Sequence, residues 1–486
     1  MRLRRALALS AADRYVSMVI GALVIAAVSR ILSPEEVGVT VLGMTLFALV
    51  DLVRDIPTTY LVQRHEVTGA TTRAAFTVML GISAVAAAIV FLAAPALAAY
   101  QGEEGLTGFF RVLALALLLG PFERPLTALL RRELAFGRVA LVNVTSVVAN
   151  AVLMVGLALL GFSYMAFAWA LVGSGLVTLV VAHAVGDRRH VIGLTRRGWT
   201  EALRIGGASG LWGLISRLTD TVPHIVFGAH GMLATVGLYG RAQTVADMPG
   251  KLLLAAIWPV ALPALAARQR GGEGLKGPVL NAIGLLSAVQ WPALLVLACL
   301  AHPATLILLG PQWLSVVPVV QVMLVARLLA PIDVVVYPVL MAQGRTLRLL
   351  MSVVLPMPVY VMVIVLAAPH GLMAVALSFL VLVPLYSVVG YVCIRGPLAL
   401  GLADLARALG KSAVAAGGAV AGPAVVLAME GFRFDISIPM AMLSGILACA
   451  GWSAALAATG HPLWAELKRS FDVVRHRTAP HFGARP

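Results

Sequence analysis

Long apolar stretches separated by short polar connections dominate the hydrophobic pattern of this chain. A stretch of about twenty residues, at about 1.5 Å per residue, crosses the roughly 30 Å hydrocarbon core of a bilayer as a helix. Alternating ten-residue strands are missing, and each spanning helix satisfies its own backbone polar groups, so helices are favoured over a β-barrel. The pattern predicts an all-α polytopic membrane protein with about fourteen spans: 15–32, 36–53, 74–94, 107–130, 139–161, 163–185, 206–228, 233–254, 279–301, 314–342, 347–368, 371–394, 412–429 and 438–460.

Composition supports the membrane assignment and excludes several other classes of protein. Only 12% of the 486 residues are charged and the mean hydropathy is +0.96, which leaves too few charges to cover a soluble protein of this size. The net charge of +15 is scattered over short loops, so no nucleic-acid partner is expected. Cys299, Cys393 and Cys449 show no disulfide or metal-ligand spacing, and no phosphate loop or catalytic motif is present. We therefore expect no catalytic residue, no metal and no cofactor.

The distribution of Lys and Arg predicts the orientation of the chain. Cations occur in the amino-terminal segment, in the even-numbered connections and in the carboxyl tail, whereas the odd-numbered connections contain only Arg433. Cytoplasmic loops carry the excess of positive charge, so both termini are predicted to be cytosolic. The first residues are expected to form a cytosolic interfacial helix, and the odd connections are too short for an extracytoplasmic domain.

Short sequence similarities indicate two parallel halves. Val37-Gly38-Val39 opens the second span as Val236-Gly237-Leu238 opens the eighth, and Gly137-Arg138 corresponds to Gly344-Arg345. Each half contains six spans, so the repeats share one orientation, as in some transporters. The predicted organisation is an interfacial helix at 1–14, a six-helix lobe at 15–186, a cytosolic linker at 187–204, a second six-helix lobe at 205–394, an extra helix pair at 395–460 and a cytosolic tail at 461–486.

Six arginines fall inside predicted spans, where each costs about 2.5–3.5 kcal/mol if it faces lipid at mid-membrane. They are Arg30, Arg111, Arg124, Arg217, Arg241 and Arg327. In the structural interpretation, Arg30 snorkels to the interface and Arg217 pairs with Asp220. In the functional interpretation, Arg30, Arg111, Arg217, Arg241 and Arg327 line a cationic cavity for an anionic substrate, because the planar guanidinium can hold two phosphate oxygens.

The acidic and capping residues of the spans are fewer. Asp220, Asp247 and Asp333 are candidate ion-coupling carboxylates, with a satisfied structural role as the alternative, and Asp51 is expected to pair with Arg54 at the interface. The run from Ser33 to Glu36 is expected to be a helix cap, with Ser33 as N-cap and Pro34 at the first helical position. Prolines within spans, Pro331 and Pro356 among them, imply kinked helices.

Several motifs resemble one known family. They are Ser29-Arg30-Ile31-Leu32-Ser33-Pro34-Glu35-Glu36-Val37-Gly38, Leu61-Val62-Gln63-Arg64, Phe110-Arg111-Val112-Leu113-Ala114, Leu130-Arg131-Arg132-Glu133-Leu134-Ala135-Phe136, Gly237-Leu238-Tyr239-Gly240-Arg241-Ala242 and Leu309-Gly310-Pro311-Gln312-Trp313. Together they resemble the polysaccharide transporter family, the Wzx-type lipid-linked oligosaccharide flippases of the MOP superfamily. The sequence departs from the commoner family pattern at Gly240, where a polar residue such as Asn often precedes the arginine.

The resemblance implies two MOP/MATE-like lobes and translocation of a polyprenyl-pyrophosphate-linked oligosaccharide across the bacterial cytoplasmic membrane by alternating access. The product would serve exopolysaccharide, capsule or O-antigen synthesis. The expected partners are the lipid-linked oligosaccharide and membrane lipids, with polysaccharide polymerase or chain-length machinery as candidates. Three alternatives stay open: a MATE-like ion-coupled antiporter of small molecules, a membrane enzyme of polysaccharide assembly and a structural scaffold.

Overall fold

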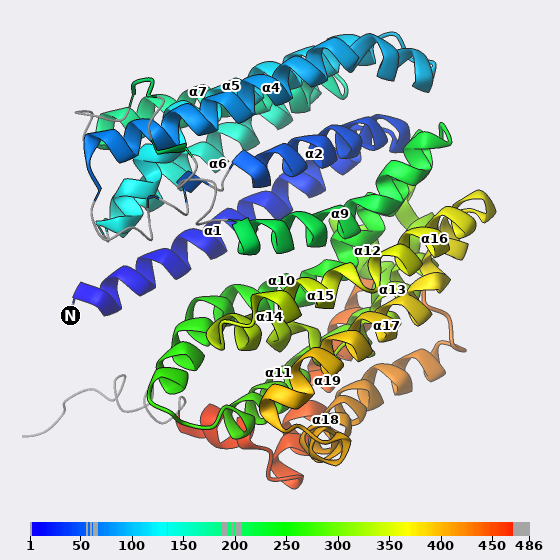
Figure 1. Ribbon diagram of the computed structural model, residues 1–486. Coiled ribbons are helices and arrows are strands. Elements are labelled where there is room, and N and C mark those ends of the chain that lie inside the picture. Colours follow the sequence, from blue (N-terminus) through cyan, green and yellow to red (C-terminus); the bar gives the residue numbers. More distant parts are fainter. Residues whose placement is uncertain are drawn as a thin grey trace, which may run out of the picture. The chain divides into compact units, whose positions relative to one another are not determined.

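The computed structural model describes residues 2–54, 57–58, 61, 67–133, 135–186, 192–195, 198–199 and 207–469. All regular elements within these ranges are helices (Figure 1), which confirms the predicted fold class. Most of the predicted linker at 187–204 and of the tail at 461–486 lies outside the described residues, as does the motif segment 62–64.

Eight helices with defined bounds lie in the described residues of the first part of the chain. They are α1 (Arg2–Ile31), α2 (Pro34–Arg54), α4 (Gly69–Gln101), α5 (Leu106–Arg132), α6 (Phe136–Leu159), α7 (Met165–Val185), α9 (Gly207–Ala229) and α10 (Leu233–Arg270). The predicted cap is confirmed at the start of α2, where Ser33 Oγ accepts from the Glu36 amide at 3.2 Å and the Ser33 amide donates to Glu36 Oε2 at 2.7 Å. This reciprocal arrangement satisfies two backbone groups that the helix leaves unpaired.

The later part of the chain contains shorter helices as well as long ones. They are α11 (Lys276–Cys299), α12 (Ala301–Leu308), the 3-10 helix η1 (Pro311–Val316), α13 (Val317–Leu328), α14 (Asp333–Ala342), α15 (Thr346–Val354), α16 (Met357–Ala367), the 3-10 helix η2 (Ala368–His370), α17 (Leu372–Leu398), α18 (Leu402–Met429) and α19 (Ile438–Ala458). Pro331 falls between α13 and α14 and Pro356 between α15 and α16, so two predicted spans are broken where proline removes a backbone donor.

The number of membrane-length helices agrees with the prediction of about fourteen spans. Within the described residues, twelve helices are long and apolar enough to cross a bilayer. The other two predicted spans coincide with α9 and α10, whose sequences carry Arg217, Asp220, Arg241 and Asp247. Helix α10 has 38 residues and is therefore about 57 Å long, so it extends beyond the hydrocarbon core.

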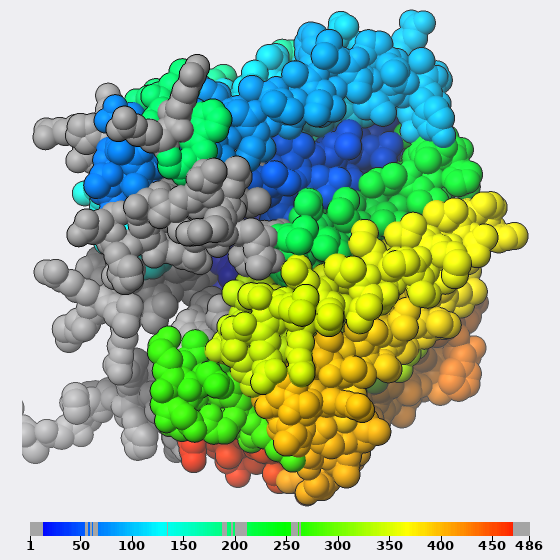
Figure 2. Space-filling model, viewed as in Figure 1, coloured from blue at the N-terminus to red at the C-terminus, as the bar shows by residue number. Residues whose placement is uncertain are grey.

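The helices form two compact units, which we describe separately. Unit 1 comprises Met1–Thr244, Thr305–Val316 and Leu350–Ser378. Its core lies where α4 packs on α5, with small residues of α4 such as Ala87 and Ala94 against the rings of Phe109 and Phe110. The outer face of α4, in lighter blue in Figure 2, carries Val85, Ile89 and Leu92, which are 62, 62 and 77% exposed. Such a surface suits contact with lipid rather than water.

Unit 2 comprises Val245–Ala304, Val317–Leu349 and Phe379–Pro486. Within it, α18 packs on both α19 and α11. A Cβ at Gly418 would come within 2.7 Å of the Gly451 carbonyl oxygen, so α18 and α19 are in backbone contact through small residues. Ser412 Oγ donates to the Gly284 carbonyl at 2.9 Å and Trp452 Nε1 donates to the Ala288 carbonyl at 2.8 Å. The carboxyl-terminal helix pair is thus bound to α11. The predicted division into lobes at 15–186 and 205–394 stays a prediction.

Candidate functional site

Three of the quoted sequence motifs meet at one place in unit 1. The Trp313 side chain of η1 is fully buried, and its Nε1 donates to the Ser29 carbonyl of α1 at 2.7 Å. Gln312 Nε2 also donates to the Ser29 carbonyl, and to the Leu32 carbonyl at 3.1 Å. The last carbonyls of a helix have no partner within it. The η1 side chains therefore cap the carboxyl end of α1.

Two of the predicted arginines belong to the same place. Arg30 donates from Nη1 to the Ala26 carbonyl at 3.0 Å and from Nη2 to the Ile307 carbonyl. Arg241 is buried on α10, with its guanidinium carbon 5.6 Å from the centre of the Trp313 ring. We call Ser29, Arg30, Arg241, Gln312 and Trp313 the motif joint. Its contacts connect α1, α10 and η1 within unit 1.

Two glycines bring α2 and α10 into direct backbone contact beside the motif joint. A Cβ at Gly38 would overlap the Leu233 carbonyl oxygen, and a Cβ at Gly237 would overlap the Pro34 carbonyl oxygen. Gly38 and Gly237 are the equivalent glycines of the two predicted repeats, so the repeat residues contact each other. Gly240, where the sequence departs from the family pattern, also lies at a close contact, since a Cβ there would lie 2.9 Å from Val41 Cγ2. The close crossing leaves no room for a longer side chain without a shift.

The other predicted residues of unit 1 lie away from the motif joint. Arg111 is exposed on α5 and its guanidinium carbon lies 5.0 Å from the centre of the Phe91 ring. Arg217 and Asp220 are exposed on α9, with Arg217 Nη1 4.0 Å from Asp220 Oδ2. That distance is the limit for an ion pair, so Arg217 keeps most of its hydrogen-bonding capacity.

Unit 2 contains the remaining predicted residues. Arg327 of α13 forms an ion pair with Asp247 of α10, and Lys251 Nζ lies 3.3 Å from the other oxygen of that carboxylate. Asp333 of α14 is exposed and accepts a hydrogen bond from Ser387 of α17 at 2.9 Å. The partners of Arg327 and Asp333 are far from them in sequence, so residue spacing could not reveal them. A binding or coupling role for any of the predicted residues stays a prediction.

A large, half-open polar cavity lies among the helices of unit 1, and the sequence did not predict it. Its volume is about 950 Å³, and α1, α2, α5, α6 and α7 contribute to its walls. We call it the polar cavity. Its polar lining residues are Asp13, Arg14, Ser17, Thr58, Glu123, Arg124, Thr127, Arg131, Asn143, Ser146, Ser174 and Thr178.

One lining residue of the polar cavity, Arg124, forms an ion pair with a neighbouring helix. Arg124 Nη2 lies 2.6 Å from Asp51 Oδ1 on α2, and Arg124 Nε lies 3.8 Å from Glu123 Oε1. Asp51 is thus paired across to α5, a contact that the sequence did not suggest; the Arg54 side chain lies outside the described residues. The exposed fractions of the Arg124 and Asp51 side chains are 22% and 30%, so this ion pair is only partly screened by solvent.

Hydroxyl and amide groups line the other walls. Asn143 Nδ2 donates to Asp13 Oδ2 at 2.8 Å, and Thr178 Oγ1 donates to Ser146 Oγ at 2.7 Å. Asp13 Oδ1 is buried and has no hydrogen-bond partner among the described residues. The cavity therefore offers charges of both signs together with neutral donors and acceptors, which suits a hydroxyl-rich or phosphorylated ligand.

A signal for the polar cavity was present in the sequence. Asn143, Ser146 and Asn150 recur at helical spacing on α6, as do Ser174 and Thr178 on α7. A polar stripe on an otherwise apolar helix indicates a face that avoids lipid. As for metals, no cluster of three His, Cys, Asp or Glu ligands occurs in the described part of the chain.

Comparison with known proteins adds independent information. A family profile described as "Polysaccharide biosynthesis protein" matches residues 27–318, a range that includes the whole motif joint. The chain is 24% identical over 321 residues to the lipopolysaccharide biosynthesis protein WzxC of Escherichia coli (strain K12), with 65% of each chain covered. It is 27% identical over 306 residues to the succinoglycan biosynthesis transport protein ExoT of Rhizobium meliloti (strain 1021), with 62% of this chain and 61% of ExoT covered. The matches thus span just under two thirds of these relatives.

Solved structures show where the same fold occurs. The lipid II flippase MurJ in an inward closed conformation aligns with 93% of this chain and 99% of its own, with a TM-score of 0.71 at 11% identity. An inward-facing multidrug resistance MATE family transporter of the MOP superfamily aligns with 79% of this chain and 94% of its own, with a TM-score of 0.60 at 16% identity. At such low identities the likeness shows the fold alone.

Proposed function

The chain belongs to the polysaccharide biosynthesis protein family, and on that premise we propose that it is a flippase for a polyprenyl-pyrophosphate-linked oligosaccharide. It moves this substrate across the bacterial cytoplasmic membrane by alternating access, for the synthesis of exopolysaccharide, capsule or O-antigen. Both termini lie in the cytosol. The relatives named for polysaccharide biosynthesis and transport support a transport role rather than an enzymatic one.

The observation that carries the proposal is the polar cavity. Polar sugars and phosphates cannot enter hydrocarbon without losing their hydrogen bonds to water. A volume of about 950 Å³ inside a bundle of membrane-length helices, with hydroxyl, amide and guanidinium groups in its walls, supplies replacement partners. Arg14 and Arg131 provide cations for the pyrophosphate, and Asn143 and Ser146 provide donors and acceptors for sugar hydroxyls.

The predicted arginines take different parts in this proposal. Arg217 contacts the pyrophosphate along the path, because its guanidinium is exposed and only weakly held by Asp220. Arg30 and Arg241 act through the motif joint that they stabilise. Arg327 and Asp247 neutralise each other, which makes both less suitable for binding substrate or a coupling ion. Asp333 accepts one hydrogen bond from Ser387 and is the better candidate for ion coupling.

Deletion of the gene in the native host tests the function. We expect lipid-linked saccharide to accumulate and the surface polymer to disappear, and the wild-type chain to restore export. Asn143→Leu, which removes the hydrogen bond to Asp13 from the polar cavity, should restore less export than Asn281→Leu, a matched change at an exposed position of α11 in unit 2. Normal polymer and no accumulation in the deletion strain would refute the flippase.

The MATE-like antiporter is the second candidate, because the fold also matches a multidrug transporter. It predicts that the deletion strain becomes sensitive to small toxic cations while its surface polymer stays intact. The two functions therefore give opposite results in one pair of strains.

A further inference from the structure

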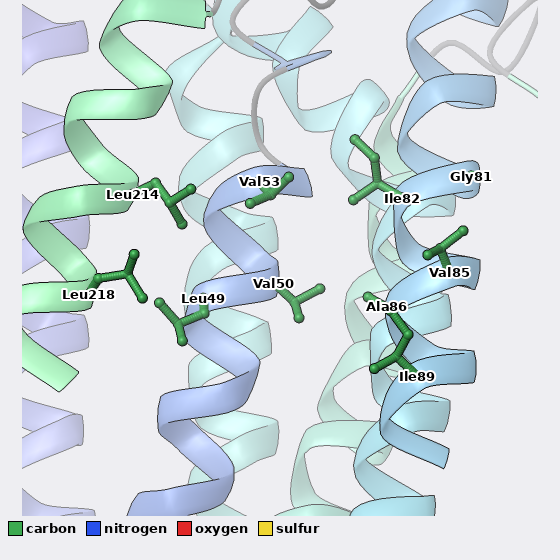
Figure 3. Close-up of a pocket in the computed structure, with 10 residues that line it drawn as sticks. All are labelled: Leu49, Val50, Val53, Gly81, Ile82, Val85, Ala86, Ile89, Leu214 and Leu218. Atoms are coloured by element: carbon green, nitrogen blue, oxygen red, sulfur yellow. The ribbon is translucent and has the colours of Figure 1, made fainter. Parts of the chain in front are cut away.

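Unit 1 also has a groove whose lining is apolar, in contrast to the lining of the polar cavity. The groove has a volume of about 560 Å³ and lies between α2, α4 and α9. All of its lining residues are apolar, and Figure 3 shows side chains from the three helices converging on it, among them Leu49 and Val53 of α2, Val85 of α4 and Leu214 and Leu218 of α9. We call it the apolar groove.

Helix α2 separates the apolar groove from the polar cavity. At 100° per residue, Phe47 and Asp51 lie on one face of α2, and Leu49 and Val53 lie on the opposite face. Phe47 lines the polar cavity and Asp51 pairs with Arg124 there, whereas Leu49 and Val53 line the apolar groove. One helix therefore has a polar compartment on one side and an apolar compartment on the other.

We propose that the apolar groove holds the isoprenoid chain of the lipid-linked substrate; this inference rests on the proposed flippase function. The occupant must be hydrocarbon, because α2 and α4 are membrane-length helices and no lining residue offers a hydrogen bond. An anionic end suits the edge of the groove, since the exposed Arg217 precedes Leu218 on α9, although Arg217 does not itself line the groove. A polyprenyl pyrophosphate has both a hydrocarbon chain and an anionic end.

The wall of the groove has free space at one position. Gly81 of α4 is exposed and a Cβ there would meet no atom within 4 Å, so this part of the wall borders open space. The methyl branches of an isoprenoid chain need more width than a straight acyl chain, and the open space at Gly81 leaves room for them.

Photo-crosslinking of the purified full-length chain tests the proposal. The probe is undecaprenyl phosphate with a diazirine on its isoprenoid chain, and labelled peptides are located by mass spectrometry. We expect labels on α2, α4 or α9 at the groove, and we expect competition by unlabelled undecaprenyl phosphate but not by an equal amount of phosphatidylglycerol. Labels elsewhere, or equal competition by both lipids, would overturn the proposal and identify the groove as a site for ordinary membrane lipid.

A groove-filling variant gives a second, independent readout. Gly81→Leu places a side chain into the free space, and helix propensity favours leucine over glycine, so the variant should fold. We expect labelling of the groove to fall about tenfold, which corresponds to about 1.4 kcal/mol. Gly108→Leu on α5 is the matched control, since a Cβ there also meets no atom within 4 Å and Gly108 does not line the groove. Equal labelling of Gly81→Leu and the control would contradict the proposal.

The two proposals can fail separately. If the deletion strain exports polymer normally, the flippase function fails, whatever the labelling shows. If export requires the protein but Gly81→Leu is labelled and exports as the wild type does, the isoprenoid groove alone fails.

Discussion

The ion pair between Asp51 and Arg124 allows a quantitative test of the polar cavity. Asp51→Asn keeps the size of the side chain and removes the charge that faces the guanidinium at 2.6 Å. Loss of one partner costs about 3–5 kcal/mol in a fully buried pair and at most about 1 kcal/mol in an exposed one. The exposed fractions of 22% and 30% place this pair between those limits, and Glu123 at 3.8 Å compensates in part. We therefore expect a loss of about 2 kcal/mol.

Thermal unfolding of the purified full-length chain in detergent measures this loss. The entropy of unfolding scales with chain length, so for 486 residues about 2 kcal/mol corresponds to a decrease in Tm of about 2 °C. The control is Asp435→Asn, the same chemical change in the loop ion pair with Arg433, whose side chains are 48% and 74% exposed. That change should leave Tm as it is, because solvent screens exposed pairs. If both variants melt at the wild-type temperature, or if both melt equally early, the partly buried pair does not stabilise the cavity and the reasoning is wrong.

Three further predictions follow from single residues. Gly237→Ala forces a Cβ against the Pro34 carbonyl and should cost about 1–3 kcal/mol of stability, whereas Gly250→Ala, on the same helix with open space around it, should be neutral or stabilising; equal Tm values would contradict the close crossing. Burial and then the charge of Lys411 lower the pKa of His461, so the folded protein resists protonation there and its stability should fall as the pH drops below about 6.5. His461→Gln should remove that part of the pH dependence of Tm, and an unchanged slope would exclude it. Arg217→Ala should lower polymer export while protein abundance on immunoblots stays normal; export at the wild-type level would remove Arg217 from the path.

The sequence was sufficient to predict the membrane fold because the constraint is strong. Apolar segments of about twenty residues have one stable form in lipid, and helix boundaries follow from caps and prolines. The cap at Ser33 is an example in which a local rule operates without help from tertiary contacts. Prolines were predicted to kink helices, and at Pro331 and Pro356 the helix ends instead. The end of α10 was not predicted, because the helix continues past residue 254 through a second, mostly apolar run and ends only at Arg270.

The candidate site was harder to predict because its contacts join residues that are distant in sequence. Arg327 pairs with Asp247, and Arg124 pairs with Asp51, in each case on another helix. From the sequence alone, only ion pairs between residues three or four positions apart on one helix could be predicted. The family motifs were recognised correctly, and three of them meet in the motif joint: Trp313 donates to the Ser29 carbonyl and its ring lies beside the Arg241 guanidinium. No spacing rule predicts these contacts, and they show that the three motifs have a packing role.

Transport of the substrate itself tests the central claim most directly. The purified full-length chain is reconstituted into liposomes that carry a polyprenyl-pyrophosphate-linked oligosaccharide in the inner leaflet, and a saccharide-specific lectin or glycosidase outside reports its arrival in the outer leaflet. We predict that the wild-type chain exposes the saccharide and that Asn143→Leu exposes it more slowly than Asn281→Leu. If liposomes with the wild-type chain expose no more saccharide than protein-free liposomes, the chain does not flip this class of lipid and the account is contradicted.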